Sequence, residues 1–128
     1  MNKALDGINL VEFDSNLGAS YAAMLLAEQG ARAVKVEPPG GARERGTAHF
    51  HALNRSKRAL FLDLQAEPSR IERLLRWADA AVFGWTGARM RELGLDYAAL
   101  ARINPRLVVL HVSPLGNRGP LADFDASD

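Results

Sequence analysis

The sequence contains no cysteine in its 128 residues, which excludes disulfide bonds and thiolate metal sites. It also lacks any apolar run close to the roughly 20 residues that a membrane-spanning helix needs. The first ten residues, MNKALDGINL, do not contain the apolar core of a signal peptide. From these absences we expect a cytoplasmic protein with no membrane partner.

An excess of charge of one sign is absent too, because 16 Lys and Arg residues face 15 Asp and Glu residues. The resulting net charge of +1 gives no basis for broad attraction to nucleic acid or to a membrane surface. The length suits one domain and is short for two. The composition is ordinary for a globular protein, so it predicts one folded unit without naming a function.

Short apolar runs alternate with helical patterns along the chain. Five runs predict buried strands, at residues 8–13, 31–36, 59–62, 80–83 and 107–112. Helices are expected between them, one from Gly18 or Ser20 to Gln29, one from Pro68, and two short ones after Thr86 and Asp96. This alternation predicts an α/β protein, with a Rossmann-like three-layer fold and a mainly parallel sheet of about five strands.

The first of these helical segments carries an apolar pattern with the spacing of a helix. Tyr21, Met24, Leu25 and Glu28 follow the i, i+3, i+4, i+7 spacing of one helix face, apolar until its last member. Ser20 or the earlier Ser15 is the expected N-cap, because a serine hydroxyl accepts a hydrogen bond from a free amide at that end.

A long loop rich in cations separates the second and third predicted strands. It contains no clear element of its own and carries Arg43, Arg45, Arg55, Lys57 and Arg58. Loops of this length are usually functional or disordered. Its cations could meet a polyanionic ligand, because Arg and Lys bind phosphate through charge and hydrogen bonds. A solvated surface loop accounts for the same composition.

Several common motifs are weak or missing. The turn after the first strand, DSNLGAS, has one glycine, so a dinucleotide site is poorly supported even though Glu37 ends the second strand. His49 and His51 are two residues apart, a spacing that makes no ready metal pair on a helix or a strand. His111 is expected to be a hydrogen-bonded residue of the core or the sheet edge. Trp85 can stack on a purine or act as a packing anchor.

Six segments, in this order and spacing, resemble one known family. They are LDGINLVEF, LLAEQGARAVKVEPPGG, LNRSKRALFLDL, ADAAVFGWTGARMRELGL, INPRLVVLHVSPLG and GNRGP. Together they are similar to the N-terminal part of the class III CoA-transferases, which include formyl-CoA transferase, the carnitine CoA-transferases and α-methylacyl-CoA racemase. The resemblance covers essentially the whole chain.

The resemblance implies a function and a set of binding residues. Family members move CoA between carboxylic acids, or epimerise an acyl-CoA, and form interlocked homodimers. CoA or acyl-CoA would be a substrate, the carboxylic acid the other partner, and no cofactor would be tightly bound. The positions that would contact CoA are Asn16, Leu17, Gly18, Pro38, Arg43, Gly84 and Trp85. Pro38 would lie near the adenine and Arg43 near the phosphates.

The family's catalytic aspartate falls beyond Asp128, where this sequence ends. Asp128 itself would match the acid of the racemases' His-Asp pair, and no residue is assigned as the transferase nucleophile. We therefore expect residues 1–128 to be the N-terminal part of the large CoA-binding domain, inactive without the catalytic and small-domain segments. The alternatives are a racemase fragment, a CoA- or nucleotide-binding module without chemistry, and a piece that self-associates through the fifth strand and Trp85.

Overall fold

The computed structural model describes residues 2–13 and 16–125 of the chain. One parallel sheet has the strand order β3-β2-β1-β4-β5. Its strands are β1 (Asn9–Phe13), β2 (Arg32–Glu37), β3 (Lys57–Phe61), β4 (Ala80–Phe83) and β5 (Val108–His111). This sheet confirms the predicted α/β class and parallel arrangement.

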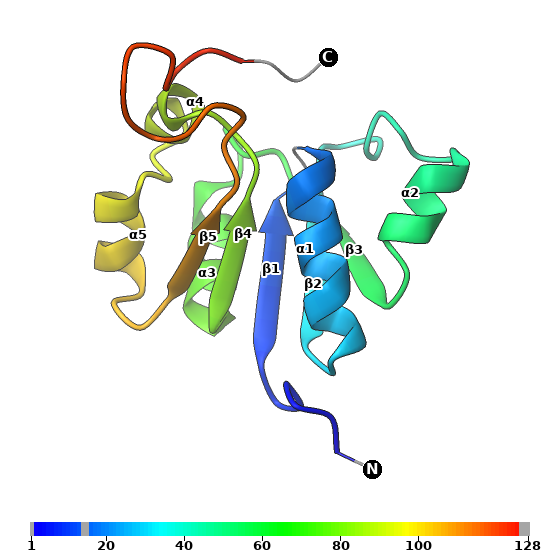
Figure 1. The fold of residues 1–128 in the computed structure, drawn as a ribbon. Helices are drawn as coiled ribbons and strands as arrows, with labels where there is room; N and C mark the ends of the chain where they lie inside the picture. The colour runs from blue at the N-terminus through cyan, green and yellow to red at the C-terminus, as the bar shows by residue number, and fades with distance from the viewer. Residues whose placement is uncertain (1, 14–15, 126–128) are drawn as a thin grey trace.

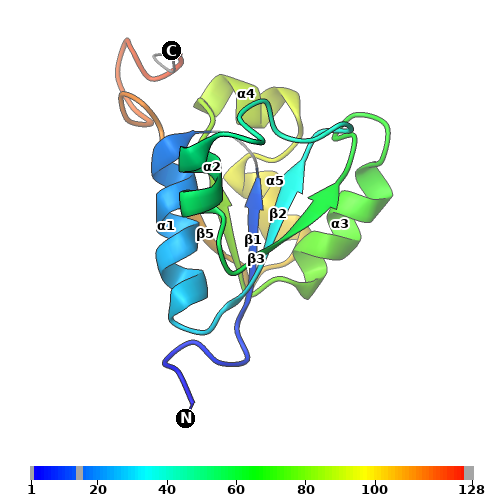
Figure 2. The ribbon, with the colours of Figure 1, turned by 90° about the vertical axis from the view of Figure 1, so that its right-hand side faces the viewer.

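In the described part of the chain, five helices cover the two faces of the sheet (Figures 1 and 2). On one face lie α1 (Leu17–Glu28) and α2 (Ala48–Leu53), and on the other lie α3 (Pro68–Trp77), α4 (Gly87–Glu92) and α5 (Tyr97–Ile103). The three-layer architecture is therefore as predicted. It places the carboxyl ends of all five strands along one side of the molecule, which is the upper side in Figure 1.

The two faces of the sheet are packed differently. Large side chains fill the face under α3, α4 and α5, where the rings of Phe13 and Phe83 stack with centroids 4.8 Å apart. The face under α1 is packed mostly by small residues, including Ala19, Ala23 and Ala27. Alanine on the helix lets α1 approach the sheet closely, so this layer is thin.

The spacing that predicts helix α1 does not mark the side that is buried. Met24 is buried, but Tyr21 is 51% exposed, Leu25 is 44% exposed and Glu28 is only partly buried. The physical reason is that α1 is apolar around most of its circumference, so the spacing of large residues did not identify the side against the sheet. The alanines, which permit close packing, occupy that side.

The predicted N-cap of α1 also needs correction. Asn16 caps the helix, with its side-chain Oδ1 accepting a hydrogen bond from the Ala19 amide at 2.9 Å. Ser20 lies one turn into the helix and is buried, and Ser15 lies outside the described residues. Asparagine is as good an N-cap as serine, so the residue type alone did not decide between them.

The long basic loop contains a helix that its sequence pattern does not predict. Thr47 caps α2, its Oγ1 accepting from the Phe50 amide at 3.3 Å, and Phe50 is the buried residue of this helix. Strand β3 also begins at Lys57, two residues earlier than the predicted 59. The first two residues of β3 are charged, which hides its start, and α2 has only six residues, too few to show a helical apolar pattern.

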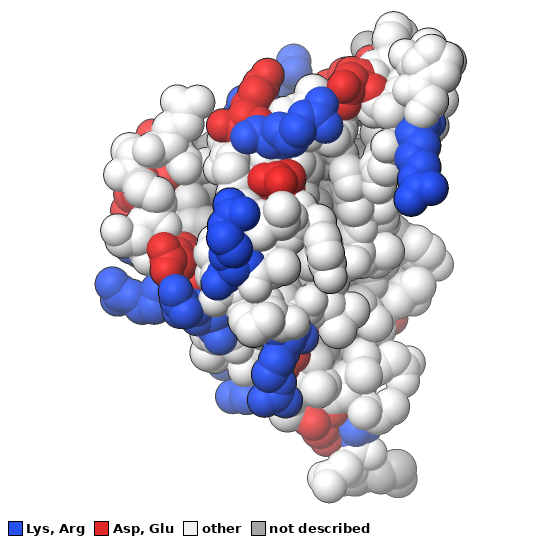
Figure 3. All heavy atoms as spheres, turned by 90° about the vertical axis from the view of Figure 1, so that its left-hand side faces the viewer, with Lys and Arg blue, Asp and Glu red and all other residues white. Residues whose placement is uncertain are grey.

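Strand β5 forms one edge of the sheet and is poorly covered. Val108 is 67% exposed and Leu110 is 42% exposed. Figure 3, which views the molecule from this side, shows a broad area without charged groups, with charged residues around it. His111 is a sheet-edge residue as expected, with its Nε2 hydrogen-bonded to the Trp85 carbonyl. In the part of the chain that the structure describes, no helix is long and apolar enough to cross a membrane.

Candidate functional site

Asn16 connects three elements at the carboxyl ends of the strands. While its Oδ1 caps α1, its Nδ2 donates to the Gly84 carbonyl at 2.6 Å and to the Val112 carbonyl at 3.0 Å. Gly84 follows β4 and Val112 follows β5, so one side chain holds the start of α1 against the ends of two strands. In sheets of this type, ligands bind at the carboxyl ends of the strands.

The structure brings several of the predicted CoA-contacting residues to this place. Leu17 and Gly18 follow Asn16 at the exposed start of α1. A side chain at Gly18 would put its Cβ 3.2 Å from Val112 Cγ1, so glycine keeps this contact open. Through Asn16, the first turn of α1 and the segment after β4 are neighbours.

Trp85 takes part in packing. It is half-buried, and its ring centroid lies 5.8 Å from that of Phe13 and 5.9 Å from that of Phe83. These tilted contacts extend the stacked pair of phenylalanines to the carboxyl end of β4. Of the two interpretations of Trp85 from the sequence, the structure favours the packing anchor.

Pro38 and Arg43 lie on the loop that follows β2, and both are exposed. The same loop is held in place by a group of hydrogen bonds to Glu37, here called the clamp. The carboxylate of Glu37 is buried and accepts hydrogen bonds from Arg45 Nε at 2.8 Å, Arg45 Nη2 at 2.9 Å and the Ala42 amide at 2.7 Å. The clamp determines the path of the loop and therefore where Pro38 and Arg43 stand.

The protonation of Glu37 is coupled to this clamp. Burial by itself raises the pKa of Glu37, but hydrogen bonds from Arg45 and Ala42, together with the charges of Arg45 and Lys35, outweigh burial. The pKa of Glu37 therefore lies below its ordinary value of 4.5. A carboxyl with a depressed folded-state pKa contributes stability above its unfolded pKa and loses it as the pH falls.

We expect Glu37→Gln to remove this pH-dependent part of the stability. At pH 7 the variant should be less stable than the parent protein, and the gap should narrow as the pH falls below about 4.5, because the parent then loses the same ionised carboxylate. Urea unfolding midpoints between pH 3 and pH 7 measure this. Glu44→Gln, an exposed change on the same loop, is the control, and parallel pH curves for parent and E37Q would contradict the prediction.

A second group of buried charges lies under α1 and α2. Lys35 Nζ is 2.8 Å from Glu12 Oε1, and Lys57 Nζ is 2.5 Å from Glu12 Oε2. Lys57 also donates to the Ser20 carbonyl at 2.8 Å and to Asn54 Oδ1 at 3.1 Å. The three charged side chains are each less than 5% exposed, and they join β1, β2 and β3 to both helices above them.

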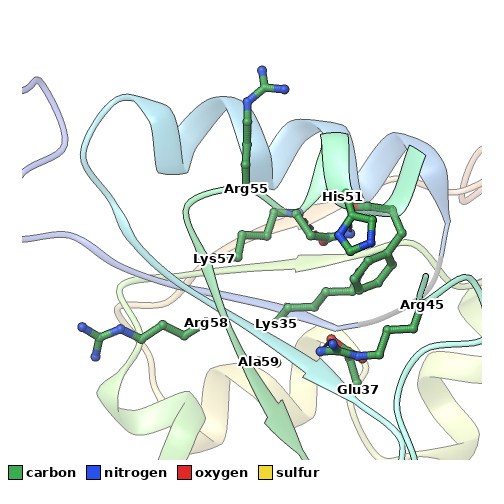
Figure 4. Close-up of a pocket in the computed structure, with 10 residues that line it drawn as sticks. Lys35, Glu37, Arg45, His51, Arg55, Lys57, Arg58 and Ala59 are labelled. Atoms are coloured by element: carbon green, nitrogen blue, oxygen red, sulfur yellow. Dashed lines mark hydrogen bonds and ion pairs between the residues drawn. The ribbon is translucent and has the colours of Figure 1, made fainter. Parts of the chain in front are cut away.

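A cavity of about 260 Å³ lies between α2 and strands β2 and β3 (Figure 4). Its lining residues are mostly nitrogen donors: Lys35, Glu37, Arg45, Phe50, His51, Asn54, Arg55, Lys57, Arg58 and Ala59. None of the seven residues predicted to contact CoA lines it. The sequence did hold a signal for it, since Lys35 and Glu37 interrupt an apolar strand and buried charges require partners.

Among residues 2–13 and 16–125, no group of three or more His, Asp or Glu residues is placed to hold a metal ion.

The chain after β5 runs beside α4, where Asp123 accepts from the Ala88 amide and from Arg91 Nη2, both at 2.9 Å. Asp128, which the resemblance matched to a racemase acid, lies outside the described residues.

Comparisons with known proteins agree with the geometry. The sequence profile of CoA-transferase family III matches residues 5–128. The succinate–glutarate CoA-transferase of Agrobacterium fabrum is 31% identical over 97% of this chain and 36% of its own length. The formyl-CoA:oxalate CoA-transferase of Streptomyces avermitilis is 31% identical over 98% of this chain and 33% of its own length.

Solved structures give the same result. A crystal structure of Rv3272 from Mycobacterium tuberculosis superposes with a TM-score of 0.90 and 30% identity, over 98% of this chain and 38% of that one. A CaiB/BaiF family protein from Brucella suis gives a TM-score of 0.88 and 31% identity, over 97% and 37%. The chain thus spans about a third of the length of the curated relatives it matches. With its sequence, its fold and the arrangement of its strand ends all in agreement, the chain belongs to CoA-transferase family III.

Proposed function

We propose that this chain is the N-terminal, CoA-binding portion of an acyl-CoA transferase, which moves CoA between carboxylic acids. The observation that carries the proposal is the position of Asn16, whose side chain joins the start of α1 to the ends of β4 and β5. The proposed CoA contacts are Asn16, Leu17, Gly18, Pro38, Arg43, Gly84 and Trp85. Leu17, Pro38 and Arg43 are exposed and therefore accessible to a ligand.

In this proposal the chain binds and orients CoA, and the bond-making carboxylate comes from elsewhere. Arg43 makes no ion pair with any described residue, so its guanidinium is available for a phosphate of CoA. Pro38 would support the adenine. The transfer itself would pass through an aspartyl-CoA thioester, in which a carboxylate acts as the nucleophile. That aspartate would lie beyond residue 128, so we propose that residues 1–128 alone do not catalyse transfer.

A CoA-dependent increase in stability tests the proposal. A ligand that binds only the folded state stabilises it by RT ln(1 + [L]/Kd), or about 2.7 kcal/mol at a hundredfold excess over Kd. We expect millimolar CoA to raise the melting temperature by several degrees, and dephospho-CoA and NAD to raise it less. Arg43→Gln should reduce the rise with CoA, whereas Arg73→Gln, an exposed arginine of α3, should leave it unchanged.

The same melting curves distinguish a second candidate function. The exposed Val108 and Leu110 of β5 favour a module that associates with copies of itself through this edge. That function predicts a melting temperature that rises with protein concentration and does not respond to CoA. The absence of any CoA-specific rise in the parent chain would rule out the CoA-binding proposal.

A further inference from the structure

We infer that the cavity under α2 is a second anion site, one that binds a phosphate dianion separately from the proposed CoA contacts. It lies on the face of the sheet that α1 and α2 cover. None of the seven proposed CoA contacts is among its lining residues. At about 260 Å³ it is smaller than the roughly 300–1,000 Å³ of pockets for drug-sized ligands. Its size therefore suits inorganic phosphate or a small phosphate ester.

The chemistry of the lining favours an anion. Seven of the ten lining side chains carry nitrogen donors, and Glu37 is the one carboxylate among them. That carboxylate is already bound by Arg45 and the Ala42 amide, so it is not free to hold a cation. Four of the five lining cations are already paired with Glu12, Glu28 or Glu37, but the cations still outnumber these carboxylates, which favours an acceptor-rich ligand.

Two of these donor side chains are not used in hydrogen bonds or ion pairs within the described part of the fold. The side chains of His51 and Arg58 make no hydrogen bond or ion pair with any described residue, and both residues are exposed. Arg55 beside them is held by Glu28, with 2.5 Å between Nε and Oε1. A tetrahedral phosphate accepts hydrogen bonds from several directions at once, so it can engage donors that approach from different sides.

The arrangement of these donors is visible in Figure 4. His51 projects from α2 toward the cavity, and Arg58 stands at the opposite rim with its guanidinium turned outward. Arg58 alternates with Lys57 along β3, so its side chain starts from the other face of this edge strand. In the proposal, the exposed guanidinium reaches round the strand edge to an anion at the rim of the cavity. Ser56 has a positive φ of 66°, a conformation that costs energy outside glycine, and it forms the turn between Arg55 and β3.

The test is calorimetric titration of the 128-residue chain with inorganic phosphate and, separately, with glycerol 3-phosphate, at constant ionic strength set with chloride. We expect saturable binding of at least one of them. A tighter fit for the ester would identify a small phosphorylated metabolite as the ligand, and equal or tighter binding of inorganic phosphate would identify free phosphate. Heats no larger than those with chloride would overturn the inference.

Variants show where the phosphate binds. The double variant His51→Gln with Arg58→Gln should weaken phosphate binding at least tenfold, and Arg32→Gln, an exposed arginine at the start of β2, should leave it within twofold. Unchanged melting temperatures without phosphate confirm that the variants fold, as expected for surface substitutions. Equal binding by the double variant and R32Q would overturn the assignment.

The proposed CoA site is tested independently of this one. If the sites are separate, the CoA-dependent rise in melting temperature persists in H51Q/R58Q and at saturating phosphate. Loss of the CoA response in H51Q/R58Q would show that the cavity holds a phosphate of CoA itself, and the second-site inference would then be wrong. Arg43→Gln, which should reduce the CoA response, should leave phosphate binding in the calorimetric titration unchanged.

Discussion

Glu12→Gln should destabilise the folded chain by about 3–5 kcal/mol, the cost typical of breaking a buried ion pair by changing one partner. Glu12 sits on the central strand β1 and is 1% exposed. Its two carboxylate oxygens contact the ammonium groups of Lys35 and Lys57 at 2.8 and 2.5 Å. A neutral amide keeps the size of the side chain, so the loss of stability in E12Q measures the effect of the charge and not of the packing.

The charge matters because both lysines are buried. Lys35 and Lys57 are 4% and 1% exposed, so water cannot replace the carboxylate as their partner. An amide also presents its NH₂ group toward one ammonium, where it can accept no hydrogen bond. Since β1, β2 and β3 all contribute to this cluster, its disruption affects the whole half of the sheet that carries the proposed anion cavity.

Urea denaturation followed by circular dichroism measures the effect. Glu72→Gln is the matched control, because Glu72 forms an exposed pair with Arg76 one turn away on α3. Exposed helix pairs contribute about 0.3–0.5 kcal/mol, so this control should change little. A loss in E12Q as small as that in E72Q would show that the buried cluster does not stabilise the fold.

Phe13→Ala should cost about 3–5 kcal/mol, the range for truncating a buried phenylalanine. Phe13 is fully buried at the carboxyl end of β1, stacked on Phe83 and in contact with Trp85. Alanine would leave a cavity that these two rings cannot fill. Phe83 is the last residue of β4 and Trp85 follows it closely, so the neighbouring strand holds both in place. The change should therefore also loosen Trp85, one of the proposed CoA contacts.

Two measurements separate the stability loss from the local effect. Urea denaturation gives the first, with Phe13→Leu expected to cost less because it retains most of the buried apolar volume. Tryptophan fluorescence in a Trp77→Phe background reports on Trp85 alone, since the sequence has two tryptophans. We expect the emission of Trp85 to shift to longer wavelength in F13A. An unchanged spectrum would mean that Trp85 is held by other contacts.

Elements with strong local signals were predicted well. Strand β4 was expected at 80–83 and is found there, and α3 begins at the predicted Pro68. Thr86 caps α4 as expected, its Oγ1 accepting from the Arg89 amide at 3.2 Å. These features depend on residues close in sequence: a short apolar run, a proline that suits the first helical turn, and a hydroxyl three residues before an amide.

Features that depend on distant contacts were missed. The buried side of α1 is decided by which residues allow the helix to approach the sheet, and an almost uniformly apolar helix does not reveal that. Helix α2 is short and depends on burying Phe50 against its neighbours. Asn16 was predicted as a CoA contact, but its role in joining α1 to Gly84 and Val112 links residues 68 and 96 positions apart.

By itself, the sequence determined the fold class, the order of the strands with four of the five described helices, and the family, because these follow from alternating apolar runs and from motifs read in order. Only the tertiary structure decided which charges are buried and what they hold. Lys35, Lys57 and Glu12 are scattered over 46 residues, and a parallel sheet brings them within hydrogen-bonding distance. The cavity beside them exists for the same reason, since its walls come from strands and a helix that meet only when the sheet forms.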